Sequence, residues 1–319
     1  VLCGSNGGNL YASLPGVGEP ILFCAHMDTV SPGKGIYPVL DEDRVLYSGG
    51  DTILGADDKS GIAAVMEMLE TLLESGLCHR PIEVLFTICE ENGLRGARHA
   101  DYSRLRSRQA VVLDSGRPHV IINRTPIHES WHVRISGKSA HAGVAPEKGI
   151  HALKAAAAAV AEIPCGRVDE ATMMNVGSFL APGSTNLVPA EANFDLEIRS
   201  HEEARVQYWS NEIASALERA CVSMGAHHTV TKERHTGLLY VPEDSKLIRD
   251  LVDAYRELGL EAVLARGFGG SDASLLFSHG IEAVNIGTGM RNIHSLEESI
   301  PMSDLERVTK LIFKLVQTG

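Results

Sequence analysis

Short apolar runs that end abruptly in ionisable residues constrain the fold of this chain more than any other feature. The clearest run covers residues 83–88 and is followed by Glu90 and Glu91, with a turn at Gly93. Such a run, bounded by turn residues, is typical of a strand buried in a parallel sheet. Ligands of open α/β sheets bind beyond the carboxyl ends of these strands. Because neighbouring side chains of an extended segment point in opposite directions, Glu90 and Glu91 can take different roles, one at a metal and one at a water.

Two further runs end in the same way, at His26 and at Asp114. Residues 20–25 precede His26, and residues 110–113 precede Asp114. Asp28 lies two positions after His26, so both side chains fall on one side of an extended segment. The Asp28 carboxylate can then hold one ring nitrogen of His26 while the other nitrogen faces a metal. A structural His–Asp pair, and a solvated surface pair for the two glutamates, are the alternative interpretations.

A loop with two aspartates, Asp57 and Asp58, leads into an amphipathic helix. The helix is predicted from apolar residues at helical spacing and from Gly76, which ends it. The apolar positions are Ile62, Val65, Met66, Leu69, Leu72 and Leu73. The two aspartates therefore lie where the helix begins, and an ordinary aspartate N-cap is the alternative interpretation.

The strand ends and this loop together supply four candidate metal ligands. These are His26, Asp57, Glu91 and Asp114. Nitrogen and oxygen donors of this kind suit zinc, manganese or cobalt, and their number exceeds what one metal ion needs. The set therefore favours a two-metal hydrolase site, in which the ions lie about 3.5–4 Å apart.

The residue pattern changes at about Arg124, and 319 residues are enough for about two domains. Residues 124–235 show the order β-α-β-β-α-β, which predicts an inserted ferredoxin-like α+β domain. Residues 1–123 and 236–319 then form an α/β domain with an open, mixed but mostly parallel sheet flanked by helices. A glycine-rich loop at residues 266–272 lacks the full dinucleotide-binding spacing, so nucleotide binding is not expected.

Composition and charge exclude several classes of partner. Apolar residues make up 44% and charged residues 22% of the chain, as in soluble globular proteins. A net charge of −12 repels nucleic acid and anionic membranes. The six cysteines are scattered without a C-x-x-C motif, which indicates reduced thiols and a cytoplasmic location. No apolar run approaches the ~20 residues of a membrane span, and no signal peptide opens the chain.

Five motifs in a fixed order resemble those of the M20 family of dinuclear metallopeptidases. They are A-H-M-D-T-V, G-A-D-D-K-S-G, C-E-E-N-G-L-R-G-A, V-L-D-S-G and N-I-H-S. Each motif alone is weak, but the ordered set is specific and covers nearly the whole chain. Within the family, the sequence is most similar to the peptidase T-like tripeptide aminopeptidases.

The resemblance implies two divalent metal ions, with zinc expected and cobalt or manganese as alternatives. The implied ligands are His26 and Asp114 for one ion, Glu91 and His294 for the other, and Asp57 as a bridge between both. A cis peptide bond between Asp57 and Asp58 is expected to accompany the bridge. Asp28 would orient His26, and Glu90 would act as the general base.

The resemblance also implies roles for three residues of the inserted domain, which would act as a lid. His141, in G-K-S-A-H-A-G, would polarise the scissile carbonyl, often from the partner subunit of a homodimer. Asn186 lies in S-T-N-L-V-P, and Arg199, in E-I-R-S, would bind a substrate carboxylate through its bidentate fork. A plain loop residue for His141 and a surface ion pair for Arg199 are the alternatives.

The implied function is metal-assisted hydrolysis of short peptides, with release of the N-terminal residue of tripeptides. A carboxypeptidase or an N-acyl-amino-acid amidohydrolase of the same family would share the ligand set. A catalytically silent binding protein would be expected to lack a ligand or the base, and none is missing. Relatives carry a further helical segment before the first strand, and the sequence also begins without Met, so we expect a lost or removed N-terminal segment.

Overall fold

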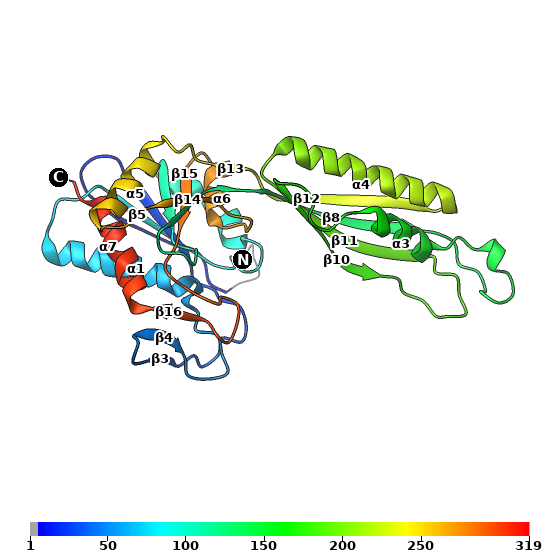
Figure 1. Cartoon of the computed structure of the whole chain (residues 1–319), viewed down its shortest axis with the longest axis horizontal. Helices are drawn as coiled ribbons and strands as arrows, with labels where there is room; N and C mark the ends of the chain where they lie inside the picture. Colours follow the sequence, from blue (N-terminus) through cyan, green and yellow to red (C-terminus); the bar gives the residue numbers. More distant parts are fainter. Residues whose placement is uncertain (1–5, 319) are drawn as a thin grey trace. The chain divides into compact units, whose positions relative to one another are not determined.

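The chain passes from its first structural unit into a second at Thr125 and returns at Leu239. In the computed structural model, which describes residues 6–318, one compact unit comprises Val1–Thr125 and Leu239–Gly319, and the other comprises Pro126–Leu238 (Figure 1). Cys3 lies outside the described residues, and the five cysteines within them form no disulfide. The first unit is thus discontinuous in sequence, and the second is inserted in it.

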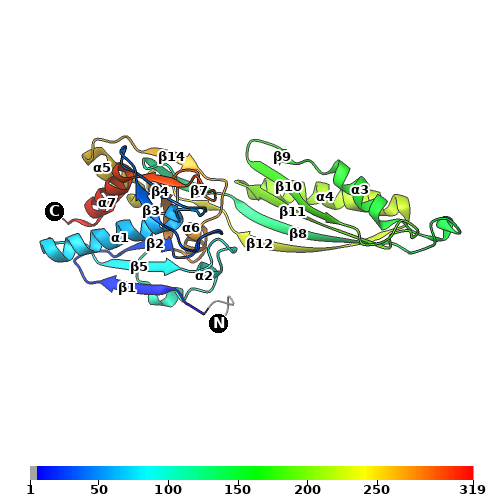
Figure 2. The same ribbon diagram turned by 90° about the horizontal axis from the view of Figure 1, so that it is seen from below.

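The first unit is built on an eight-stranded mixed sheet. Its strands are β1 (Leu10–Leu14), β2 (Ile21–His26), β5 (Ile82–Thr87), β6 (Gln109–Val112), β7 (Val120–Thr125), β13 (Leu239–Tyr240), β14 (Val263–Arg266) and β15 (Glu282–Ile286). Their order in space is β1-β5-β2-β6-β15-β7-β13, and β14 pairs with β7. The neighbouring strands β5, β2, β6 and β15 are parallel, and Figure 2 shows β1, β5 and β2 side by side. The predicted α/β architecture with a mixed, mostly parallel sheet is confirmed.

Helices cover this sheet. They are α1 (Ala56–Ser75), α2 (Arg95–Arg98), the 3-10 helix η1 (Tyr102–Arg104), α5 (Lys246–Glu257), α6 (Asp272–Ser278) and α7 (Met302–Val316). Helix α1 packs against β2 and α7, and α6 packs against β6 and β15. Every residue of β2 and β5 is buried, as expected for parallel strands that are covered on both faces. A small antiparallel sheet is formed by β3 (Pro38–Leu40), β4 (Val45–Ser48) and β16 (Ser299–Pro301).

The second unit is an antiparallel sheet with two long helices packed on it. Its strands are β8 (Ile127–Ser136), β9 (Gly166–Arg167), β10 (Thr172–Leu180), β11 (Glu191–Ser200) and β12 (His227–Thr236), in the spatial order β12-β8-β11-β10-β9. The helices are α3 (Ala152–Glu162) and α4 (Glu203–Met224), with a 3-10 helix η2 (Pro146–Lys148) before them. Side chains of both long helices share a core with Trp131 of β8 and Phe194 of β11. The chain order adds the short β9 and the 3-10 helix η2 to the expected β-α-β-β-α-β pattern.

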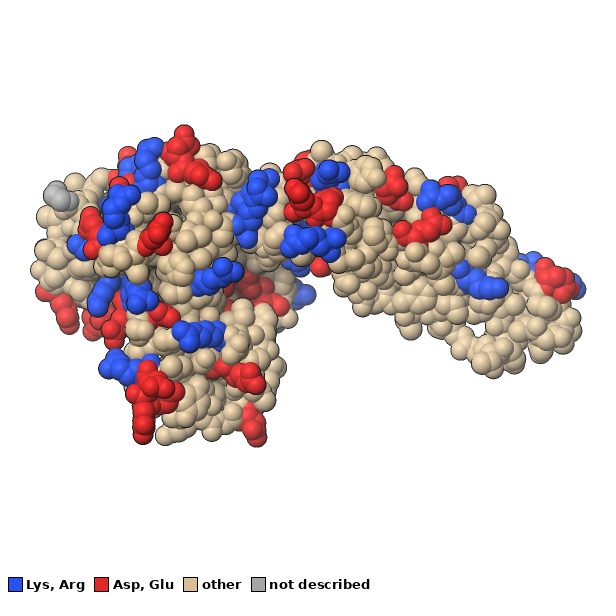
Figure 3. Space-filling model, in the orientation of Figure 1, with Lys and Arg blue, Asp and Glu red and all other residues tan. Residues whose placement is uncertain are grey.

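The surface shows charges of both signs. On the face drawn in Figure 3, Lys and Arg side chains are interspersed with Asp and Glu side chains over each unit. Among the described residues, no helix is both long enough and apolar enough to cross a membrane.

Candidate metal centre

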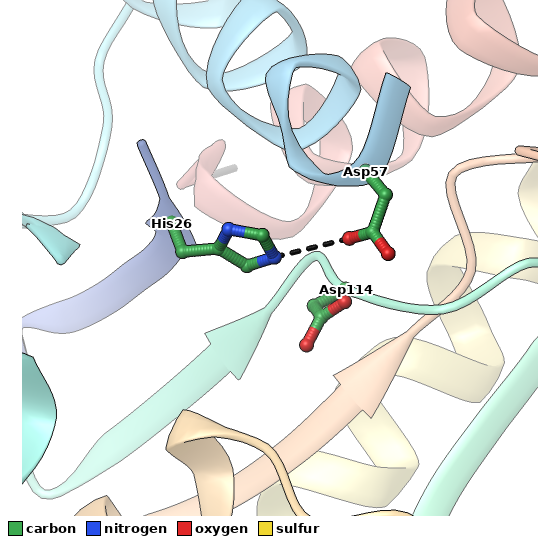
Figure 4. A group of neighbouring side chains, drawn as sticks. All are labelled: His26, Asp57 and Asp114. Atoms are coloured by element: carbon green, nitrogen blue, oxygen red, sulfur yellow. Dashed lines mark hydrogen bonds and ion pairs between the residues drawn. The ribbon is translucent and has the colours of Figure 1, made fainter. Parts of the chain in front are cut away.

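Parallel strands bring the predicted site residues to one edge of the first unit's sheet. His26 is the last residue of β2, Asp114 follows the end of β6, and Glu90 and Glu91 follow the end of β5. The register of the parallel strands pairs His26 with Thr87 and Cys24 with Val112, so these strand ends lie close together. Figure 4 shows His26, Asp57 and Asp114 converging from a strand end, the beginning of α1 and a second strand end.

The donor atoms form two groups that share Asp57. Ligand atoms of His26, Asp57 and Asp114 all lie within 4.8 Å of one another, and so do those of Asp57, Glu91 and His294. His26 Nε2 lies 3.0 Å from Asp57 Oδ1, whereas His294 Nε2 lies 3.2 Å from Asp57 Oδ2 and 2.8 Å from Glu91 Oε1. Each carboxylate oxygen of Asp57 therefore faces a different group. This donor set fits two divalent ions that share one carboxylate.

Asp58, which sequence reasoning left without a role, joins the Asp57 loop to the end of β2. Its carboxylate accepts a hydrogen bond from the backbone N–H of His26 at 3.1 Å and from that of Gly61 at 3.2 Å. The side chain is fully buried, and the peptide bond between Asp57 and Asp58 is cis. Asp58 thus fixes the backbone of one candidate ligand relative to another. Its only sequence signal is its position beside Asp57.

Asp28 contacts His26, but not in the predicted way. The Nδ1–H of His26 donates to the backbone carbonyl of Asp28 at 2.9 Å, while the carboxylate oxygen Oδ1 lies 3.7 Å from Nδ1. A carbonyl can only accept, so Nδ1 carries the proton and Nε2 is left to bind a metal. The Asp28 carboxylate instead accepts hydrogen bonds from the backbone N–H groups of Glu90 and Glu91, at 3.0 and 3.2 Å.

Glu90 lies beside the two groups and lines the same cavity. The cavity has a volume of about 280 Å³ and is also lined by glycines of the loop between β14 and α6. Burial, and after it the negative charge of Asp272, raises the pKa of Glu90 to about 8. Asp272 is itself buried and accepts a hydrogen bond from Thr87 Oγ1 at 2.5 Å. A carboxyl group with so high a pKa can exchange a proton near neutral pH.

The three predicted residues of the inserted domain lie in the second unit. His141 and Asn186 come together there, because His141 forms an isolated bridge with Leu187 and the carbonyl of Asn186 accepts from the N–H of Ala142 at 2.8 Å. Arg199 lies on β11 and donates to Glu197 through Nε at 3.2 Å and Nη2 at 3.1 Å.

Glu197, which sequence reasoning did not identify, also forms a hydrogen bond with His128 Nε2 at 3.1 Å. The hydrogen bond with His128, followed by those from Arg199, overcomes the effect of burial and lowers the pKa of Glu197 to about 2. Glu197 is therefore ionised at neutral pH and holds the guanidinium of Arg199 in place.

Curated relatives match most of this chain. A protein of Bacillus subtilis (strain 168), "Uncharacterized protein YqjE", is 36% identical over 320 residues, which cover 99% of this chain and 86% of the relative. Peptidase T of Escherichia fergusonii is 27% identical over 293 residues, which cover 88% of this chain and 70% of that protein.

Solved structures of similar proteins also match nearly the whole of this chain. The crystal structure of aminopeptidase PepT from Bacillus cereus ATCC 10987 matches 98% of this chain and 85% of its own, with 34% identity and a TM-score of 0.91. A tripeptidase from Staphylococcus aureus subsp. aureus mu50 matches 97% of this chain and 83% of its own, with 30% identity and a TM-score of 0.92. The family model described as "Peptidase family M20/M25/M40" matches residues 22–318. This chain therefore belongs to peptidase family M20/M25/M40.

Proposed function

We propose that this protein is a dinuclear metal-dependent peptidase that releases the N-terminal residue of short peptides, tripeptides above all. The observation that carries the proposal is the pair of donor groups that share Asp57, with Glu90 beside them in the same cavity. The names of the similar solved structures, an aminopeptidase and a tripeptidase, support the choice of substrate.

The ligands are assigned from the two donor groups. His26 and Asp114 would hold one ion, Glu91 and His294 would hold the other, and Asp57 would be shared by both. Zinc is the ion we expect, with cobalt or manganese as alternatives, because the donors are imidazole nitrogens and carboxylate oxygens. When bound, two such ions polarise the scissile carbonyl and make the attacking water more acidic.

Glu90 is assigned the role of general base. Its carboxylate would accept a proton from the attacking water and then give it to the leaving amine. Glu90 directly precedes Glu91, lines the same cavity and belongs to neither donor group, which supports a role other than that of a ligand.

The second unit is assigned to substrate binding. His141 donates a hydrogen bond to the carbonyl oxygen as negative charge develops on it, and one such donor is typically worth about 3–4 kcal/mol. Arg199, oriented by Glu197, binds a substrate carboxylate, and Asn186 lies beside His141 on the same surface. The unit acts as a lid and mediates a homodimer in this proposal.

The proposal is tested by measuring metal content and peptide hydrolysis together. Dialysed protein is titrated with zinc, cobalt or manganese, and each sample is given tripeptides with free termini. We expect activity to saturate near two ions per chain, with the N-terminal amino acid as the first product.

Other outcomes would assign a different function. Cleavage of N-acetyl amino acids but not of tripeptides would identify an acyl-amino-acid hydrolase. Release of the C-terminal residue would identify a carboxypeptidase. A protein that binds no divalent ion would be a silent member of the family, and the proposal would be wrong.

A further inference from the structure

A buried carboxylate outside the predicted ligand set contacts the backbone on both sides of Ala56. Glu298 is 1% exposed. Its Oε2 accepts a hydrogen bond from the backbone N–H of Gly55 at 2.7 Å, and its Oε1 accepts one from the backbone N–H of Asp57 at 2.9 Å. Both oxygens of Glu298 are thus bound to the segment that presents the shared carboxylate of Asp57.

These two amides lie at the start of α1, where the backbone is irregular and the N–H groups have no partner within the helix. Gly55 is in the left-handed conformation, Asp57 and Asp58 have non-helical backbone angles, and no side chain caps the helix at its N-cap position. The first N–H groups of a helix need partners from outside the helix. Glu298, which is 241 residues away from Asp57 in sequence, supplies an acceptor for both.

Glu298 belongs to the same short loop as His294. Arg291 and Ser299 close this loop through reciprocal backbone hydrogen bonds of 2.8 and 3.1 Å. Inside it, the N–H of Glu298 donates to the carbonyl of Ser295, and His294 is in a left-handed conformation with φ of 63°. The loop then continues directly into β16, which pairs with β4. One closed loop therefore carries both a candidate ligand and the carboxylate that holds Asp57.

This arrangement links the positions of the two candidate ligands. His294 Nε2 lies 3.2 Å from Asp57 Oδ2, and the backbone N–H of Asp57 is bound to Glu298, four residues after His294. We propose that Glu298 is a positioning residue that fixes the distance between Asp57 and His294 and so maintains the second metal site. This inference rests on the proposed metal ligands, but not on the choice of substrate.

The Glu298→Gln substitution isolates this role. Glutamine has nearly the same shape, but its amide group turns one acceptor into a donor, which then faces a backbone N–H. Substitution of residues that orient metal ligands typically lowers metal affinity by about 10–100-fold. We expect a loss of that size for the ion held by Glu91 and His294, and a smaller loss for the ion held by His26 and Asp114.

Glu297 provides a matched control. It is the neighbouring carboxylate and is exposed, whereas Glu298 is buried. The Glu297→Gln variant removes the same charge from the same loop, so a general electrostatic effect would appear in both variants. A positioning effect appears only at Glu298.

The test is a cobalt titration of the dialysed protein. Binding is monitored by calorimetry and by the visible absorption of bound cobalt. The wild type and Glu297→Gln are expected to bind two ions with similar affinities, while Glu298→Gln binds the second ion about 10–100-fold more weakly. Thermal melting of the metal-free proteins, followed by circular dichroism, checks that each variant is folded. If Glu298→Gln does not fold, Glu298→Asp takes its place, because its shorter side chain cannot reach both amides.

Two results would overturn the inference. One is wild-type affinity for both ions in a folded Glu298 variant. The other is an equal loss of affinity at both sites. A wild-type protein that binds two ions but does not cleave peptides would contradict only the proposed substrate, and the comparison of variants would still decide the role of Glu298.

Discussion

The carboxylate of Asp28 accepts a hydrogen bond from the backbone N–H of Glu90, with 3.0 Å between Oδ1 and the nitrogen. Its other oxygen accepts from the N–H of Glu91 at 3.2 Å. The backbone just before Glu90 is in the left-handed conformation, since Cys89 has a φ of 55°. The carbonyl of Asp28 meanwhile orients the ring of His26. One residue therefore positions a candidate ligand through its backbone and the candidate base through its side chain.

Replacement of Asp28 by asparagine should lower activity without removing metal. The Asp28→Asn variant keeps the backbone carbonyl that binds His26 but loses one of the two acceptors for the N–H groups of Glu90 and Glu91. We expect kcat/KM for a tripeptide to fall about 10–100-fold, as is typical for residues that orient a site. Metal content, measured on the same samples, should stay near the wild-type value.

The control for this variant is Asp51→Asn, which removes a carboxylate from an exposed position. It should have wild-type activity. Wild-type activity in Asp28→Asn as well would show that the hydrogen bonds to Glu90 and Glu91 do not position the base.

Replacement of Glu90 by glutamine should abolish turnover but not metal binding. Glutamine has a similar shape and cannot accept a proton at neutral pH, and the loss of a general base typically lowers the rate by about 10²–10⁴-fold. Both ions should remain bound, because Glu90 is in neither donor group. Steady-state rates and metal analysis on one preparation check this prediction. Full activity in Glu90→Gln would exclude Glu90 from the mechanism.

Removal of single histidines should separate the two metal sites. His26→Ala should weaken the ion bound with Asp114, and His294→Ala should weaken the ion bound with Glu91. Each loss should exceed the about 10–100-fold change that is typical of residues outside the ligand set. Asp57→Ala should weaken both ions, because each of its oxygens faces a different group. Calorimetric titration with zinc measures these affinities, and equal effects of the two histidine variants would argue against separate sites.

The strand ends of the sheet could be predicted because each follows a buried apolar run. His26, Glu90, Glu91 and Asp114 all lie directly after such runs, and parallel pairing then brings them to one edge. The hydrogen bonds of the Asp28 and Glu298 carboxylates could not be predicted from the sequence. These carboxylates bind backbone N–H groups that lie 62 and 241 residues away, and a backbone amide has no side chain to mark it in a sequence.

The buried face of α1 was predicted only in part. Val65 and Leu72 are buried as expected, but Met66 and Leu73 are 55% and 68% exposed. The helix approaches the sheet along small residues instead, and a Cβ at Gly61 would lie 2.8 Å from the carbonyl oxygen of Leu113. Because small residues bring this face of α1 close to the sheet, a pattern of large apolar residues cannot identify it.

The last prediction concerns stability and the buried carboxylate of Glu83 on β5. It accepts hydrogen bonds from the backbone N–H of Ser107 at 2.8 Å, from the hydroxyl of Ser107 at 2.7 Å and from the backbone N–H of Arg106 at 3.0 Å. Burial raises the pKa of Glu83, but the hydrogen bonds from Ser107 and Arg106 together outweigh it and hold the pKa below its usual value. The ionised form is therefore favoured by folding.

A carboxyl group whose pKa is lowered by folding stabilises the protein above its unfolded pKa, which is about 4.3 for glutamate. That contribution is lost as the pH falls through the lower pKa of the folded state. Glu83→Gln should thus lower the free energy of unfolding at pH 7 by about 1.5–3 kcal/mol, the typical value of a hydrogen bond to a charged group. Below about pH 4 the difference from wild type should shrink, because the wild-type carboxylate becomes protonated. Urea unfolding of the metal-free proteins at several pH values measures this difference. Glu70→Gln, at an exposed position, is the control. If the difference in unfolding free energy between wild type and Glu83→Gln does not depend on pH, the effect comes from packing and not from the charge.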